Sequence, residues 1–414
     1  MKYYFPDSQD QIDPAYDFTN ERSPEFRVRQ RDDRYAHEVL QWPAYSGILV
    51  SKPIVDGWVN APGKYTLAQR HRLYRLGVRG FFRLEQPRWS IATMGDCGAF
   101  TYVREDLPPY TVDEVIDFYD GCGFDYGISI DHVILGYDAT ETSASIGAWT
   151  ARQRLTLDLA VDFLSKAKRR RTRFKPLGVA QGWSPASYAA AVVALQRMGY
   201  RYIALGGMVP LRTYQIDACL RAVAKVRRPD VQFHLLGVSR FEHIHALPDY
   251  GVASFDSTSP LRQAFKDDRD NYYTPERNYV AIRVPQVDGN PKLKALIRAG
   301  RIDQRQARKL ELRCLRELGD FDLGRTTLPA VVAALRDYAV LVGADRDRST
   351  DYAELLERAP WRDCECGICR EVGIQVVVFR GAERNKRRGF HNVYVFGRRV
   401  EASMDSVPAI GGTS

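Results

Sequence analysis

Polar side chains and a glycine pair stand at the ends of five short apolar runs in the first two thirds of the chain. Asp96, Asp131 and Asp256 follow or close three of these runs, Gln181 closes a fourth, and Gly206-Gly207 ends the fifth. One such aspartate is usually a helix cap or turn former, but five ends of this kind favour a shared site. Two carboxylates can cleave a glycosidic bond, because one attacks the anomeric carbon while the other moves the leaving group's proton. A neighbouring glycine pair would let a flat base approach the backbone.

Three cysteines crowd together near the end of the chain in the pattern C-x-C-x2-C. Cys364, Cys366 and Cys369 could supply three thiolates from one tight loop, and His391 could supply an imidazole. Four protein ligands complete a tetrahedral site with no open position, which predicts a structural Zn²⁺ rather than a catalytic metal. The alternative is a set of free thiols beside an unrelated histidine. The remaining cysteines are scattered along the chain: Cys97, Cys122, Cys219 and Cys314.

The composition is that of a globular protein with an affinity for polyanions. Of the 414 residues, 45% are hydrophobic and 27% are charged, which excludes wholesale disorder and a fibrous architecture. Sixty Lys and Arg against 51 Asp and Glu give a formal charge of +9, which favours approach to DNA or RNA. No apolar run approaches the roughly 18 residues of a membrane span, and the first residues lack the apolar core of a signal peptide. We expect a cytoplasmic protein without membrane contact.

The elements that would position the strand-end residues alternate between strands and helices, which is typical of a parallel sheet. The carboxyl ends of all strands in a (β/α) barrel face one mouth, so the five run ends would become neighbours there. We therefore expect an irregular (β/α)8 TIM barrel, irregular because the connection 85–88 is too short for a helix. A doubly wound open sheet is the alternative. The eight expected strands are 47–50, 80–84, 90–94, 126–131, 175–181, 202–206, 232–237 and 252–256.

The alternation of expected strands and helices is confined to residues 45–260. We expect an N-terminal extension over 1–44, the barrel over 45–260, a mostly helical insertion over 261–360, a zinc-binding subdomain over 361–400 and a flexible tail over 401–414. Expected helices include 111–119, 185–198 and 214–226 in the barrel, with 291–318 and 328–342 in the insertion. Each has apolar residues at three- and four-residue spacing.

The strand-end motifs, taken in order with the cysteine cluster, resemble the tRNA-guanine transglycosylase family over roughly residues 45 to 400. Two pieces are closer to the archaeal branch, which handles 7-cyano-7-deazaguanine. The opening of the chain, residues 4–10, resembles the DpdA-type branch, the DNA-guanine transglycosylases. The motifs are Asp96-Cys97-Gly98-Ala99-Phe100, Val179-Ala180-Gln181-Gly182, Ala204-Leu205-Gly206-Gly207-Met208-Val209-Pro210, Phe255-Asp256-Ser257 with Lys266-Asp267-Asp268-Arg269, and His391-Asn392-Val393-Tyr394-Val395.

The resemblance implies a role for each strand-end residue. Asp256 matches the nucleophile that attacks C1′ of the target nucleoside and forms a covalent enzyme–sugar intermediate. Asp96 matches the general acid and base. Asp131 matches the residue that binds the Watson–Crick edge of the base, with Gln181 and the Gly206-Gly207 backbone adding hydrogen bonds. Because C1′ is hidden in a stacked duplex, the target nucleotide must be extruded or already single-stranded.

The implied activity is exchange of guanine in DNA for a 7-deazaguanine base, with 7-cyano-7-deazaguanine as the expected substrate, in a DNA modification system that could need accessory proteins. The alternatives are a tRNA-modifying enzyme of the same chemistry and a non-catalytic zinc-bearing partner subunit. Relatives dimerise through the zinc region, so a homodimer is expected unless the insertion blocks that surface.

Several positions depart from the family pattern or stand outside it. The family reads Asp-Ser-Gly-Gly where this chain has Asp96-Cys97-Gly98-Ala99, and His132 follows Asp131 where bacterial relatives have a second acid. His132 could alter base selection or be a structural histidine at the barrel rim. Two basic runs are also prominent. We expect 166–173 to be a solvated face at the amino end of the barrel. For 384–388, which lies beside aromatic residues, contact with nucleic acid and a role without such contact are both open.

Overall fold

The computed structural model describes residues 1–85, 89–238, 241–266 and 269–405. The chain divides into two compact units. The barrel unit comprises Met1–Gln9, Tyr45–Thr258 and the residues from Val400 onward, and the second unit comprises Asp10–Ala44 and Ser259–Arg399. Within the described ranges, no helix is both long enough and apolar enough to cross a membrane.

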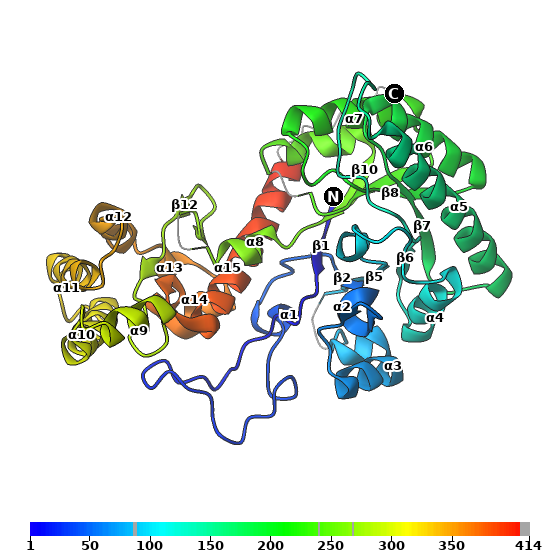
Figure 1. The fold of residues 1–414 in the computed structure, drawn as a ribbon. Helices are drawn as coiled ribbons and strands as arrows, with labels where there is room; N and C mark the ends of the chain where they lie inside the picture. Colours follow the sequence, from blue (N-terminus) through cyan, green and yellow to red (C-terminus); the bar gives the residue numbers. More distant parts are fainter. Residues whose placement is uncertain (86–88, 239–240, 267–268, 406–414) are drawn as a thin grey trace. The chain divides into compact units, whose positions relative to one another are not determined.

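The barrel unit is built on eight parallel strands that close on themselves, as expected for a TIM barrel (Figure 1). Around the barrel the order is β1-β10-β9-β8-β7-β6-β5-β2. Alternate inward residues from most strands, including Tyr4, Leu49, Met94 and Leu177, fill its centre. The strands are β1 (Lys2–Pro6), β2 (Gly47–Ser51), β5 (Ala92–Asp96), β6 (Tyr126–Ile128), β7 (Lys175–Ala180), β8 (Tyr202–Leu205), β9 (Gln232–Leu235) and β10 (Val252–Asp256).

Seven of the eight expected strands are present, and one prediction was wrong. Residues 80–84 are not a strand, because α3 (Leu67–Phe81) continues to Phe81 and turns follow it. These residues are the end of that helix and the turn after it, with Phe81, Phe82 and Leu84 buried, and a short apolar run alone does not distinguish a helix end from a strand. The missing strand is β1, whose Tyr4 pairs with Gly47 on one side and with Asp256 on the other. Part of the short connection that suggested irregularity, residues 86–88, lies outside the described residues, as do Asp267 and Asp268.

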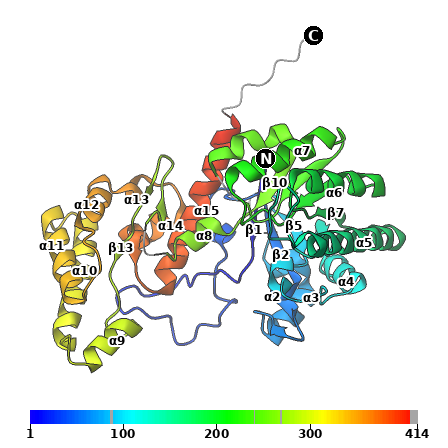
Figure 2. The same cartoon turned by 45° about the horizontal axis from the view of Figure 1, so that its top comes forward.

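Helices cover the outside of the barrel between consecutive strands (Figures 1 and 2). Some of them begin at a residue whose side chain caps the first turn. In α6, Ser184 accepts a hydrogen bond from the backbone N–H of Ser187 at 3.1 Å, and Pro185 occupies the first turn. The principal helices after α3 are α4 (Val112–Cys122), α5 (Ile146–Arg170), α6 (Pro185–Met198) and α7 (Thr213–Val226), and α2 (Lys52–Asp56) with the hairpin of β3 (Gly57–Trp58) and β4 (Ala61–Pro62) follows β2.

The second unit is mostly helical. The run expected over 291–318 is broken into two helices, because Gly300 adopts a positive φ of 66° between them. The last helix continues to Asp405, into the segment expected to be a flexible tail, and residues 406–414 lie outside the described residues. Its helices are α1 (Ala36–Val39), α8 (Ser259–Gln263), α9 (Pro291–Arg298), α10 (Gln304–Asp322), α11 (Leu328–Leu341), α12 (Ser349–Arg358), α13 (Pro360–Asp363), α14 (Gly367–Val372) and α15 (Gly381–Asp405).

Candidate active site and metal centre

The strand-end residues all lie at the carboxyl ends of barrel strands. Asp96 and Asp256 are the last residues of β5 and β10, while Gln181 and Gly206 directly follow β7 and β8. Asp131 lies three residues beyond the end of β6. Because the strands are parallel and the sheet is closed, these residues share one mouth, which is where TIM-barrel enzymes have their active sites.

The carboxyl group of Asp96 is in an environment that favours its protonated form. Burial raises the pKa of Asp96, and the negative charge of Asp256 raises it further. The Ser51 hydroxyl donates a hydrogen bond to Asp96 Oδ2 at 2.6 Å, which partly offsets the rise. A buried carboxyl group beside a second carboxylate is suited to carry a proton, which is the requirement for a general acid.

Within the part of the chain that the structure describes, the carboxylate of Asp256 is held through one of its two oxygens. Its Oδ1 accepts a hydrogen bond from the backbone N–H of Gly237 at 2.9 Å and lies 3.2 Å from Nε2 of His234. Gly237 follows β9 with a φ of 71°, a left-handed conformation that glycine adopts without strain. Strand β9 and the residues that follow it therefore position the aspartate that ends β10.

Asp131 is the centre of a buried polar cluster. Gln181 Nε2 donates to its Oδ2 at 2.6 Å, and the Cys97 thiol donates to its Oδ1 at 3.1 Å. Burial raises the pKa of Asp131 to about 7, and the charge of Asp96 contributes to the rise. The Tyr102 hydroxyl donates to the backbone carbonyl of Asp131 at 3.2 Å. These contacts fix the carboxyl group in one orientation.

The glycine pair leaves room for the Gln181 side chain. A Cβ on Gly206 would lie 2.2 Å from Gln181 Nε2, and one on Gly207 would lie 2.4 Å from the carbonyl oxygen of Ile134. The N–H of Gly206 donates to the Ala180 carbonyl at 3.0 Å within the sheet. Among the backbone hydrogen bonds of the described residues, the N–H of Gly207 has no acceptor.

The four predicted metal ligands come together in the second unit. The Sγ atoms of Cys364, Cys366 and Cys369 lie 3.6, 3.5 and 3.2 Å from Nδ1 of His391, and all four ligand atoms lie within 4.8 Å of one another. Tetrahedral Zn–S and Zn–N bonds of about 2.3 and 2.0 Å would separate sulfur from nitrogen by roughly 3.5 Å. The cluster could therefore hold a metal such as zinc.

The surroundings of His391 orient it for metal binding. Its Nε2 lies 2.7 Å from the Tyr273 carbonyl oxygen, to which it can only donate, so Nδ1 is left for the metal. The ring of Tyr272 stacks on the imidazole with the centroids 4.3 Å apart and the planes 2° from parallel. The cysteines lie around α14, where Cys366 is the N-cap, and His391 lies on α15.

Comparison with known proteins identifies the family. The chain is 48% identical over 411 residues to a DNA-guanine transglycosylase of Salmonella montevideo, which covers 98% of this chain and 97% of the relative. The chain belongs to the DNA-guanine transglycosylase family. It is thus a pentosyltransferase of the base-exchanging kind. No known protein-family model matches the chain.

The two basic runs of this transglycosylase differ in their surroundings. In the first, Lys166 pairs with Asp113 at 2.7 Å and Arg170 with Asp117 at 2.7 Å, on the outside of the barrel. The second, 384–388, is mostly buried and is not a surface for nucleic acid. Arg387 and Arg388 are 1% and 0% exposed, and Arg387 pairs with Glu383 at 2.8 Å. Carboxylate and backbone carbonyl groups accept hydrogen bonds from these arginines, so the run is part of the buried interior of the second unit.

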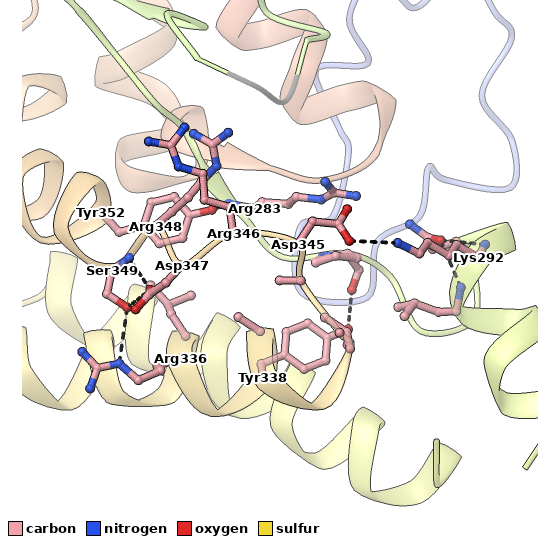
Figure 3. Close-up of a pocket in the computed structure, with 18 residues that line it drawn as sticks. Arg283, Lys292, Arg336, Tyr338, Asp345, Arg346, Asp347, Arg348, Ser349 and Tyr352 are labelled. Atoms are coloured by element: carbon pink, nitrogen blue, oxygen red, sulfur yellow. Dashed lines mark hydrogen bonds and ion pairs between the residues drawn. The ribbon is translucent and has the colours of Figure 1, made fainter. Parts of the chain in front are cut away.

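Exposed arginines of the transglycosylase gather instead in the helical part of the second unit. A hollow of about 270 Å³ lies between α9, α11 and α12. Figure 3 shows Arg283, Arg346 and Arg348 on one side of this hollow, across from Arg336 and Tyr338. Basic side chains lining it outnumber Asp345 and Asp347, so the hollow favours anions.

Sequence reasoning missed the residues that hold the transglycosylase's site aspartates. Ser51 and His234 contact Asp96 and Asp256 from adjacent strands, and only the register of those strands could have indicated them. Cys97, which departs from the family motif, contacts Asp131 directly. His132 is fully buried, with Nε2 2.8 Å from the carbonyl oxygen of Glu105, which is the contact of a structural histidine.

Proposed function

We propose that this transglycosylase exchanges guanine in DNA for a 7-deazaguanine base, with 7-cyano-7-deazaguanine as the substrate. The proposal rests on the pair Asp96 and Asp256 at one barrel mouth, where the two carboxyl groups have contrasting surroundings. It is supported by the full-length similarity to a DNA-guanine transglycosylase.

In the first half-reaction, a carboxylate oxygen of Asp256 attacks C1′ of the target deoxyguanosine. The C1′–N9 bond breaks, and guanine leaves with the electron pair on N9 and accepts the proton of Asp96. The raised pKa of Asp96 favours the protonated form that this step requires. The products are free guanine and an ester between Asp256 and the deoxyribose.

In the second half-reaction, the ionised Asp96 takes the N9 proton of the incoming deazaguanine. N9 of this base attacks C1′ from the face that guanine vacated, and the bond from C1′ to the Asp256 oxygen breaks. The carboxylate of Asp256 and the protonated Asp96 are regenerated, so the enzyme needs no redox cofactor.

The base is held by the Asp131 cluster. The carboxylate of Asp131 accepts the N–H groups of the base's Watson–Crick edge, while Gln181 keeps that carboxylate in place. The backbone N–H of Gly207 is the donor for an oxygen of the base. Guanine and 7-deazaguanines share this edge, so one pocket accepts both the leaving base and the incoming one.

Zinc is proposed as a structural ion. Cys364, Cys366, Cys369 and His391 would fill all four positions of a tetrahedral Zn²⁺, so no position remains for water or substrate. Its contribution is to folding of the second unit.

The partner is DNA, whose phosphates would be contacted by exposed cations. The arginines that line the hollow of Figure 3 face a solvent-accessible space, whereas the arginines of the 384–388 run are buried. Phosphate contacts of this kind position a protein without reading sequence.

The test is nucleoside mass spectrometry on DNA and tRNA purified separately from deazaguanine-producing cells. The cells express the wild type or Asp256→Asn, which removes the nucleophile and keeps the side-chain shape. We expect a 7-deazaguanine deoxynucleoside in DNA with the wild type and none with the variant, at equal protein levels. A signal confined to tRNA would replace the DNA proposal with the RNA one. Absence from both pools, in cells that contain folded wild-type protein, would refute an exchange activity.

A further inference from the structure

Behind the Asp256 carboxylate, the barrel interior contains a chain of hydrogen-bonding side chains that the two half-reactions do not use. His234 on β9 and Ser254 on β10 are cross-strand partners, and both are fully buried. Nδ1 of His234 lies 2.5 Å from Ser254 Oγ, which also hydrogen bonds the hydroxyl of Tyr202. The other ring nitrogen, Nε2, faces Asp256 Oδ1 at 3.2 Å. The order of contacts is Tyr202, Ser254, His234, Asp256.

The direction of these hydrogen bonds follows from the carboxylate at the end of the chain. A carboxylate only accepts, so the nitrogen that faces it must carry a proton. In a neutral imidazole Nδ1 is then an acceptor, and it receives the Ser254 hydroxyl proton. Ser254 Oγ in turn accepts from Tyr202, and burial raises the pKa of Tyr202 to about 12, which keeps its proton in place. Each donor therefore has one acceptor, and the tautomer of His234 is fixed.

The two oxygens of Asp256 are thereby made different. Oδ1 receives both His234 Nε2 and the Gly237 N–H, whereas Oδ2 accepts no hydrogen bond from the described residues. The ring of Tyr4 lies edge-on to His234, with the centroids 5.7 Å apart, and keeps the imidazole from turning. An oxygen without a donor retains its lone pairs for attack on carbon.

We infer that His234 is a positioning residue that holds Asp256 by Oδ1 and presents Oδ2 to C1′ of the target nucleoside. This inference rests on the proposed function and adds the atom that forms the bond. Oδ2 forms the ester bond to C1′ as the bond to guanine N9 breaks, and Oδ1 becomes the ester carbonyl and keeps its two donors. When the incoming base displaces Oδ2, negative charge returns to the carboxylate and the same donors stabilise it.

The test compares three variants in the exchange reaction that the wild type performs and Asp256→Asn does not. His234→Phe keeps a ring against Tyr4 and removes both nitrogens. His234→Gln restores an N–H donor near the position of Nε2. Tyr126→Phe is the matched control, because Tyr126 packs edge-on against Tyr202, with the centroids 5.8 Å apart, and lies outside the hydrogen-bonded chain.

We expect His234→Phe to lower kcat by roughly 10- to 100-fold, the effect of losing one hydrogen bond to a charged group, with little change in KM for the base. His234→Gln should recover part of the loss, and Tyr126→Phe should match the wild type. The enzyme–DNA ester, followed as a slower band on a denaturing gel, should persist longer in His234→Phe because its breakdown is slowed.

A purely structural role for His234 would give a different result. His234→Phe would then lower thermal stability while kcat per folded enzyme stayed at the wild-type value, and His234→Gln would not improve on it. That outcome would overturn the inference and leave the proposed function intact. Failure of the wild type itself to exchange bases would refute the proposed function, and the inference with it.

Discussion

The raised pKa of Asp131 makes a quantitative prediction about how the enzyme binds its base. Asp131 is 2% exposed, and burial raises its pKa to about 7. Its carboxylate must be ionised to accept the N–H groups of the base, so a proton on Asp131 competes with base binding. The apparent dissociation constant of 7-cyano-7-deazaguanine should therefore rise as the pH falls below neutrality.

The size of the effect follows from the pKa. At pH 8 about nine tenths of Asp131 is ionised in the free enzyme, and at pH 6 about one tenth, so the base should bind about tenfold more weakly at pH 6. An aspartate with an ordinary pKa of about 3.9 would be ionised at both pH values and would produce no change. The direction is set by burial, the largest contribution to the shift.

Calorimetric titration of the free enzyme with the base at pH 6, 7 and 8 measures this change directly. Asp131→Asn is the control, because an amide cannot titrate in this range, and it should bind more weakly but with a flat pH profile. A dissociation constant that is the same at pH 6 and pH 8 in the wild type would refute the reasoning. The reasoning would also be refuted if the dissociation constant of Asp131→Asn changed with pH as much as that of the wild type, since another group, such as Asp96, would then be responsible.

Two further predictions concern the second unit. Cys366→Ala should reduce bound zinc from about one ion per chain to almost none and lower the melting temperature, since structural zinc contributes roughly 10 kcal/mol to folding of small domains; unchanged metal content by mass spectrometry would contradict the site. Arg346→Glu should raise KM for DNA by about two- to tenfold and reduce the salt dependence of binding by about one counterion. Arg346→Glu should leave the affinity for the base unchanged. The control is Arg154→Glu, on the exposed face of α5, which should alter none of these values. Equal effects of the two substitutions would show that the hollow does not contact DNA.

The barrel was largely predictable because parallel strands are buried on both faces and so form continuous apolar runs. Seven runs fulfil that expectation. The residues 80–84 satisfied the same criterion as the buried end of α3. The strand β1 did not stand out, because it lies before the second unit's segment Asp10–Ala44 and is not followed by a crossover helix. Only closure of the barrel, with Tyr4 between Gly47 and Asp256, assigns it.

The site aspartates were predictable from their positions, but their environments were not. Position after a strand requires only the local sequence, whereas hydrogen bonds from Ser51 and His234 depend on cross-strand register. The run 384–388 shows the same limit. Arg384 pairs with Glu21, and Arg380 pairs with Glu311 at 2.6 Å. These acids, which lie far away in the sequence, offset the desolvation cost of burying the arginines.

The proposed mechanism gives Asp256 and Asp96 different tasks, and the neighbours of each aspartate account for the difference. Asp256 has two N–H donors on one oxygen, which suits an anion that must attack carbon and later leave it. Asp96 is buried beside the charge of Asp256, which raises its pKa and suits it to hold a proton. The two conditions are linked, since burial raises the pKa of Asp96 and the negative charge of Asp256 adds to that rise. If Asp256 forms the proposed neutral ester, its repulsion disappears, which favours transfer of the Asp96 proton to the departing guanine and ionisation of Asp96 for the incoming base. In the proposed mechanism, formation of the ester therefore lowers the pKa of Asp96 between the step in which it acts as an acid and the step in which it acts as a base.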